Sequence, residues 1–114
     1  MTLAAEPVEI EPADVRSLAV AGGGDWLLLD CRTAEEHATA RIAGAMLVPM
    51  PDLPERLATI EAWRDKPVIV HCHHGVRSLR VVHWLRERGF SRARSMRGGI
   101  EAWSVEIDAS VPRY

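Results

Sequence analysis

The stretch from residue 68 to residue 90, VIVHCHHGVRSLRVVHWLRERGF, constrains the fold more than any other part of the chain. It opens with Val68–Val70, a run of β-branched residues typical of a strand buried on both faces of a parallel sheet. Downstream, Leu79, Val82 and Leu85 recur at helical spacing, and Gly89 marks the end of this helix. A buried strand that passes directly into an amphipathic helix indicates an α/β fold.

The loop between this strand and helix carries the candidate chemistry. Cys72 stands where the strand ends, and the residues that follow form a candidate substrate-binding loop: His73, His74, Gly75, Val76, Arg77 and Ser78. Free backbone N–H groups and the positive end of a helix dipole favour a thiolate or a bound anion at such a place. Cys72 is therefore the candidate nucleophile. The alternative is a cysteine that only packs in the core, which is common for this residue type.

The rest of the chain predicts four more strands and four more helices. The strands are expected at residues 8–10, 26–30, 45–48 and 94–96, and the helices from residue 12, at 34–38, at 53–63 and up to residue 103. Thr33 is suited to cap the second of these helices, and Gly22–Gly24 to form a flexible turn. Strands that alternate with helices predict a mostly parallel five-stranded sheet flanked by helices in three layers. The segment 104–114 shows no clear element.

Polar residues follow the strand at 26–30, at the carboxyl end, where open α/β sheets place their sites. Asp30 and Arg32 have two interpretations: an ion pair that holds the loops, which we favour, or direct contacts with substrate. Cys31 lies between them beside an apolar run, and this setting favours packing over redox chemistry.

Composition and charge exclude several classes of function. A chain of 114 residues is sufficient for one domain with its own core, and a net charge of −2 gives no general attraction to nucleic acid or anionic membranes. Seven arginines lie between Arg77 and Arg97 and can steer a small anion towards Cys72. Two cysteines in unlike settings do not predict a disulfide framework, and no signal peptide or membrane span is evident. A cytoplasmic location is the expectation.

Several linked motifs resemble the signatures of rhodanese domains. The matching segments, in the family's order, are Leu28–Arg32, Glu35–His37, Arg41–Ala45, Cys72–Ser78, Gly89–Phe90 and Met96–Trp103. Departures are confined to the first signature, where Ala40, Arg41 and Ala43 replace the usual Gly, His and Pro. The Cys-His-His-Gly loop and residues 107–114 are similar to one subgroup of small bacterial rhodanese domains. Related domains are also found appended to sulfur-carrier-activating enzymes.

The resemblance implies a single rhodanese-like domain over residues 1–114, with a core at about 8–103 and a tail at 104–114. It implies a thiosulfate-type sulfurtransferase in which Cys72 takes the outer sulfur of a small anionic donor and becomes a persulfide. Cyanide, a thiol or a protein then accepts that sulfur. Backbone N–H groups of the loop would hold the negative charge, and Arg77 would close the loop by contacting either substrate or a carboxylate. No metal or organic cofactor is implied.

Two other classes remain as alternatives. Cysteine phosphatases and arsenate reductases share this fold but use Cys-x5-Arg, whereas the spacing from Cys72 to Arg77 is Cys-x4-Arg, which suits a single sulfur atom. A metal-binding or purely partner-binding module is the second alternative, because His71, Cys72, His73 and His74 are soft ligands. Adjacent residues cannot all point at one ion, and the chain keeps the nucleophile, so a metal site is not expected.

Overall fold

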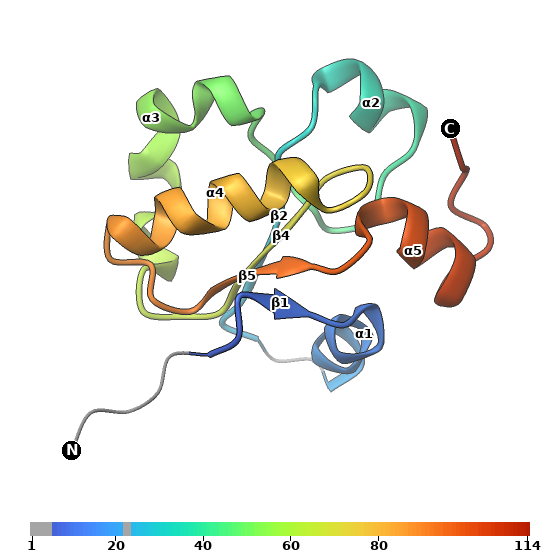
Figure 1. Cartoon of the computed structure of the whole chain (residues 1–114), viewed down its shortest axis with the longest axis horizontal. Coiled ribbons are helices and arrows are strands. Elements are labelled where there is room, and N and C mark those ends of the chain that lie inside the picture. The colour runs from blue at the N-terminus through green and yellow to red at the C-terminus, as the bar shows by residue number, and fades with distance from the viewer. Residues whose placement is uncertain (1–5, 22–23) are drawn as a thin grey trace.

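A computed structural model describes residues 6–21 and 24–114. Five strands form one sheet in the order β1-β5-β4-β2-β3, and each of the pairings between them is parallel. The strands are β1 (Glu9–Ile10), β2 (Leu27–Asp30), β3 (Met46–Leu47), β4 (Val68–His71) and β5 (Ala93–Met96). The predicted five-stranded parallel α/β fold is thus confirmed, with β4 at the centre of the sheet (Figure 1).

Helices cover both faces of this sheet (Figure 1). They are α1 (Pro12–Ala21), α2 (Ala34–Thr39), η1 (Met50–Asp52), α3 (Leu53–Arg56), η2 (Leu57–Trp63), α4 (Val76–Glu87) and α5 (Gly99–Glu106). Alternate residues of β2 and β4 point to opposite faces, because the side-chain period of a strand is two residues. Leu29 and Val70 pack in the core under α3, η2 and α4, whereas Leu28 and Ile69 pack in the core under α1 and α5. Because both of its faces are buried, the sheet requires the continuous apolar strands seen in the sequence.

The prediction of a single helix at residues 53–63 is wrong. Between residues 50 and 63 the structure has only one α-helical turn, α3, which lies between the 3-10 helices η1 and η2. Pro54 lies in the first turn of α3, where its missing N–H needs no partner. The Thr59 hydroxyl donates to the Arg56 carbonyl at 2.5 Å, a local bond that competes with the α-helical ladder. Leu53 and Ile60 belong to the apolar stripe that predicted a helix here, and both are nevertheless buried.

The C-terminal segment is more ordered than the sequence suggested. Helix α5 continues past Trp103 to Glu106, and Val111 is buried in the core under α1 and α5. Ser104 Oγ donates to the Val111 carbonyl at 2.6 Å, which ties the segment to the helix. The turn expected at Gly22–Gly24 falls largely outside the described residues. Within the described residues, the structure contains no helix of sufficient length and hydrophobicity to cross a membrane.

Candidate active site

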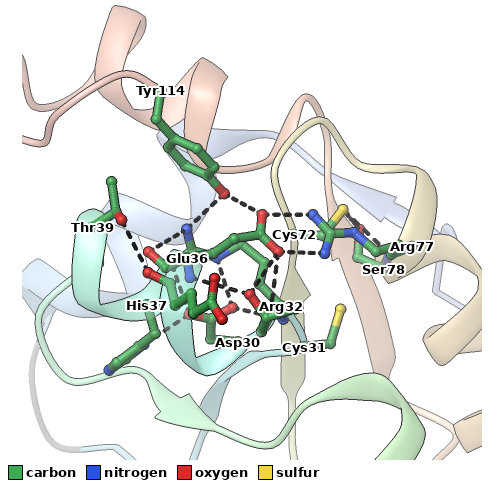
Figure 2. A network of polar contacts seen from close by, with 12 residues as sticks. Asp30, Cys31, Arg32, Glu36, His37, Thr39, Cys72, Arg77, Ser78 and Tyr114 are labelled. Carbon is green, nitrogen blue, oxygen red and sulfur yellow. Dashed lines mark hydrogen bonds and ion pairs between the residues drawn. The ribbon is translucent and has the colours of Figure 1, made fainter.

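The candidate nucleophile lies at the carboxyl end of the central strand, immediately before α4 (Figure 2). Cys72 Sγ accepts the backbone N–H of Gly75 at 3.0 Å and that of Ser78 at 3.4 Å. Gly75 has φ +100°, a left-handed conformation that residues with a side chain rarely adopt, and this conformation turns the loop back over the sulfur. Cys72 is 1% exposed, so only a small reagent reaches its sulfur without movement of the loop.

Two buried serines support the sulfur from the side of β5. The Cys72 thiol lies 3.4 Å from Ser78 Oγ, and Ser78 Oγ lies 2.6 Å from Ser95 Oγ. Both serines are fully buried. Their hydroxyl groups satisfy each other in the apolar interior, where an unpaired hydroxyl would be costly. Ser78 therefore contributes to the site through its N–H and its side chain, and Ser95 contributes a partner that sequence reasoning missed.

Helix α5 holds the other side of the loop by its N-terminus. The Ile100 N–H donates to the Cys72 carbonyl at 2.9 Å, and the Glu101 N–H donates to the His73 carbonyl at 3.1 Å. Gly99 makes this approach possible, because a Cβ at that position would lie 2.5 Å from both carbonyl oxygens. Two of the N–H groups that a helix start leaves without intrahelical partners thus bind the loop backbone.

Arg77 is held by a carboxylate and closes the loop onto α2. Its Nη1 and Nη2 donate to the two carboxylate oxygens of Glu36 at 2.6 Å and 2.9 Å, a bidentate ion pair (Figure 2). The hydrogen bonds from Arg77 hold the pKa of Glu36 well below its usual range, against the opposing effect of partial burial. In this structure Arg77 braces the loop through a carboxylate, which is one of the two roles that the sequence left open.

Glu36 is placed by the start of α2. Thr33 Oγ1 accepts the Glu36 N–H at 3.1 Å, and Glu36 Oε1 accepts the Thr33 N–H at 3.2 Å, which completes a capping box. The expected Thr33 cap is confirmed. The same carboxylate that caps α2 also binds Arg77, and sequence reasoning did not identify Glu36 as a site residue.

Asp30 and Arg32 form the favoured ion pair below this brace. Arg32 Nε and Nη2 donate to the Asp30 carboxylate at 2.9 Å and 2.7 Å, and Nη2 also donates to the Ala40 carbonyl at 2.6 Å. Both residues are fully buried. Burial raises the pKa of Asp30, but the hydrogen bonds from Arg32, the charge of His71 and the contact with His37 hold it below its usual value. The pair joins β2 to the end of α2.

Tyr114 reaches the site from the C-terminal segment (Figure 2). Its hydroxyl accepts from Arg32 Nη1 at 2.8 Å and donates to Glu36 Oε2 at 2.6 Å. Its ring stacks on His73, with ring centroids 3.9 Å apart. Tyr114 thus links the buried ion pair, the brace and the loop. No local sequence pattern predicts that Tyr114 belongs to the site, because its partners are up to 82 residues away in the chain.

The two loop histidines lie at the rim with Glu101. His73 stacks on His74 at 3.9 Å between centroids, and one ligand atom from each of His73, His74 and Glu101 lies within 4.8 Å of the others. Sequence reasoning did not anticipate this grouping. The Glu101 carboxylate is paired with the Arg113 guanidinium. Burial and the neighbouring His74 lower the pKa of His73.

The fold and this loop define a class: a parallel α/β domain with a cysteine held by backbone N–H groups at the start of a helix. A family model for the rhodanese-like domain matches residues 12–106. The chain belongs to the rhodanese-like domain family, as its motifs predicted.

Relatives carry sulfurtransferase names. A "Sulfurtransferase" of Allochromatium vinosum is 38% identical over 80 residues, which cover 70% of this chain and 73% of that protein. "Thiosulfate sulfurtransferase GlpE" of Coxiella burnetii is 35% identical over 86 residues, covering 75% of this chain and 78% of that one. "Adenylyltransferase and sulfurtransferase MOCS3-2" of Zea mays is 35% identical over 97 residues, covering 81% of this chain. The match spans only 20% of the length of that maize protein.

Solved structures show the same fold. A rhodanese-like domain protein from Staphylococcus aureus superposes with a TM-score of 0.78 at 27% identity, covering 93% of this chain and 97% of the other. The human single-domain sulfurtransferase TSTD1 superposes with a TM-score of 0.75 at 26% identity, covering 89% and 98%.

Proposed function

We propose that this protein is a sulfurtransferase that moves sulfane sulfur from a small anionic donor, such as thiosulfate, to a thiophilic acceptor through a persulfide on Cys72. The Cys72 thiolate attacks the outer sulfur of thiosulfate, the S–S bond of the donor breaks, and sulfite leaves with the bonding electron pair. Cyanide or a thiol then attacks the outer sulfur of the persulfide and regenerates Cys72. The two displacements through one covalent intermediate give ping-pong kinetics.

The observation that carries this proposal is the pair of N–H groups, from Gly75 and Ser78, that converge on Cys72 Sγ. Donors fixed in this way stabilise negative charge on sulfur without reorganising during the reaction. The buried sulfur and the short loop suit a transferred group of one atom. The relatives named sulfurtransferase add support from outside the structure.

The same geometry weighs against the phosphatase alternative. Phosphoryl or arsenyl transfer needs a cation aimed at the oxygens of a bound oxyanion. Both terminal nitrogens of Arg77 are instead occupied by Glu36. A protein sulfur donor or acceptor is compatible with the proposal, because the exposed rim of the loop (His74 and Val76) is open to a partner.

The test is to incubate the reduced protein with thiosulfate, remove the excess and record the intact mass. We expect the wild type to gain one sulfur atom and to lose it on addition of cyanide, with sulfite released in equal amount. Cys72→Ser should gain nothing, whereas Cys31→Ala should load as the wild type does. A folded wild-type protein that gains no sulfur from thiosulfate or from a small-molecule persulfide would overturn the proposal, and turnover of an aryl phosphate would favour the phosphatase.

A further inference from the structure

The second cysteine of the chain lies beside the first. Asp30 of β2 pairs with His71 of β4, so Cys31 and Cys72 occupy the next position on each of two neighbouring parallel strands. The ladder continues there, because the Cys31 N–H donates to the His71 carbonyl at 3.2 Å. Neighbouring strands lie about 4.8 Å apart, within the Cα separation of about 4.4–6.8 Å that a disulfide requires.

The two side chains also point to the same face of the sheet. Because side chains alternate along a strand, Cys31 points to the same face as Leu27 and Leu29. Cys72 likewise points to the same face as Val68 and Val70. Both cysteines belong to the core under α3, η2 and α4, and both are free thiols that are 1% exposed. Figure 2 shows them at the ends of the adjacent strands.

The Cys31 thiol is directed towards the strand that carries Cys72. Its Sγ donates to the carbonyl of His71, the residue just before Cys72, at 3.4 Å. It takes no part in the network of Asp30, Arg32 and Glu36. Burial, with the nearby charge of Cys72, raises the pKa of Cys31 to about 12. Cys31 is thus a protonated thiol at neutral pH and does not compete with Cys72 for the first reaction with a small reagent.

We propose that Cys31 is a resolving cysteine that forms an intramolecular disulfide with Cys72 once Cys72 has been oxidised by a peroxide. The peroxide oxidises the Cys72 thiolate to a sulfenic acid and is itself reduced to water or an alcohol. Cys31 sulfur then attacks Cys72 Sγ, the S–O bond breaks, and the leaving hydroxide takes the Cys31 proton and departs as water. This modification is separate from sulfur transfer and requires only that Cys72 be reactive.

The disulfide has two consequences. Cys72 Sγ must turn from the Gly75 and Ser78 N–H groups towards β2, so the oxidised protein cannot accept sulfur. The bond also protects Cys72 from sulfinic and sulfonic acids, which thiols do not reverse. A dithiol restores both cysteines by thiol–disulfide exchange.

To test this, the reduced protein is treated with increasing hydrogen peroxide and then examined by intact mass, by peptide mapping without reductant, and by the thiosulfate assay. In the wild type we expect a loss of two hydrogen atoms, a peptide pair linking Cys31 to Cys72, and lost activity that dithiothreitol restores in full. In Cys31→Ser the mass should instead rise by two or three oxygen atoms on Cys72, and activity should stay lost after dithiothreitol.

Controls separate this inference from folding and from the proposed function. Cys31→Ala repeats the test without placing a hydroxyl in the core, and both Cys31 variants should match the wild type before peroxide is added. If Cys72 of the wild type gains oxygen as readily as in the variants, the inference is wrong. A disulfide only between two chains, or no modification at a peroxide concentration that oxidises glutathione, would also overturn it. The mass readout does not depend on whether thiosulfate is the donor.

Discussion

Glu36 and Arg77 are joined by two hydrogen bonds of 2.6 Å and 2.9 Å, and this pair connects the first turn of α2 to the first turn of α4. Glu36 completes the capping box of α2 with Thr33, while Arg77 lies beside the loop that encloses Cys72. In this structure the guanidinium therefore holds the loop to a carboxylate that lies 41 residues earlier in the chain.

Breaking this brace should lower activity through the loop. We expect Arg77→Met and Glu36→Gln each to reduce kcat/KM for thiosulfate by about tenfold to a hundredfold, because small misplacements of reacting groups are this costly. The double variant should lose little more than either single variant, since both remove the same interaction. A much larger loss in Arg77→Met than in Glu36→Gln would instead show that Arg77 contacts the donor.

Gly99 should be far less tolerant than another glycine of similar backbone conformation. Gly99 has φ +61° and its Cβ position lies 2.5 Å from the Cys72 and His73 carbonyls, whereas Gly44 has φ +85° and nothing within 4 Å. Alanine at either site costs about 1 kcal/mol or more in backbone strain. We expect Gly99→Ala to lose additional stability and most activity, because the loop must move away. Chemical unfolding and steady-state rates compare the two variants, and equal effects would contradict the prediction.

The Tyr114 hydroxyl should contribute measurably to stability. Tyr114→Phe removes one bond from Arg32 and one to Glu36 but keeps the ring that stacks on His73. We expect a loss of about 1–2 kcal/mol in the free energy of unfolding, because two buried or half-buried polar groups lose a partner. Deletion of Tyr114 should cost more, since the stacking is lost as well. A Phe variant as stable as the wild type would show that the hydroxyl bonds contribute nothing.

His71 should make the protein less stable in mild acid. Burial lowers the pKa of His71 from 6.5 to about 4. Between these values the unfolded chain binds a proton at His71 and the folded protein does not, so stability falls as pH decreases from about 6.5 towards 4. The full effect is about 3 kcal/mol.

Urea unfolding at a series of pH values checks this prediction. His71→Gln should remove most of the slope in that window, whatever its effect on absolute stability. His83→Gln, at an exposed position on α4, should keep the slope of the wild type. Asp30 and Glu36, whose pKa values are also lowered, contribute at lower pH. The lowered pKa of His73 adds to the slope in the same window, and this part persists in His71→Gln. An unchanged slope in His71→Gln would contradict the assignment.

The sequence by itself determined the sheet and the position of the nucleophile. The runs at residues 27–29 and 68–70 are apolar without alternation, and only a sheet covered on both faces buries such strands completely. The residue that follows such a strand and precedes a helix must lie at the carboxyl edge, which placed Cys72, Gly75 and Arg77 in one loop. Local chemistry also predicted the Thr33 cap.

Only the tertiary structure decided which groups surround that loop. Glu36, Ser95, Gly99 and Tyr114 meet the Cys72 loop by long-range packing, and no local spacing encodes contacts between residues so far apart in the chain. The break of the expected helix at 53–63 likewise followed from the local hydrogen bond of Thr59 to the Arg56 carbonyl, which competed with the apolar stripe. The placement of Cys31 beside Cys72 depends on the register of β2 against β4, because a shift of one residue would turn Cys31 to the opposite face of the sheet.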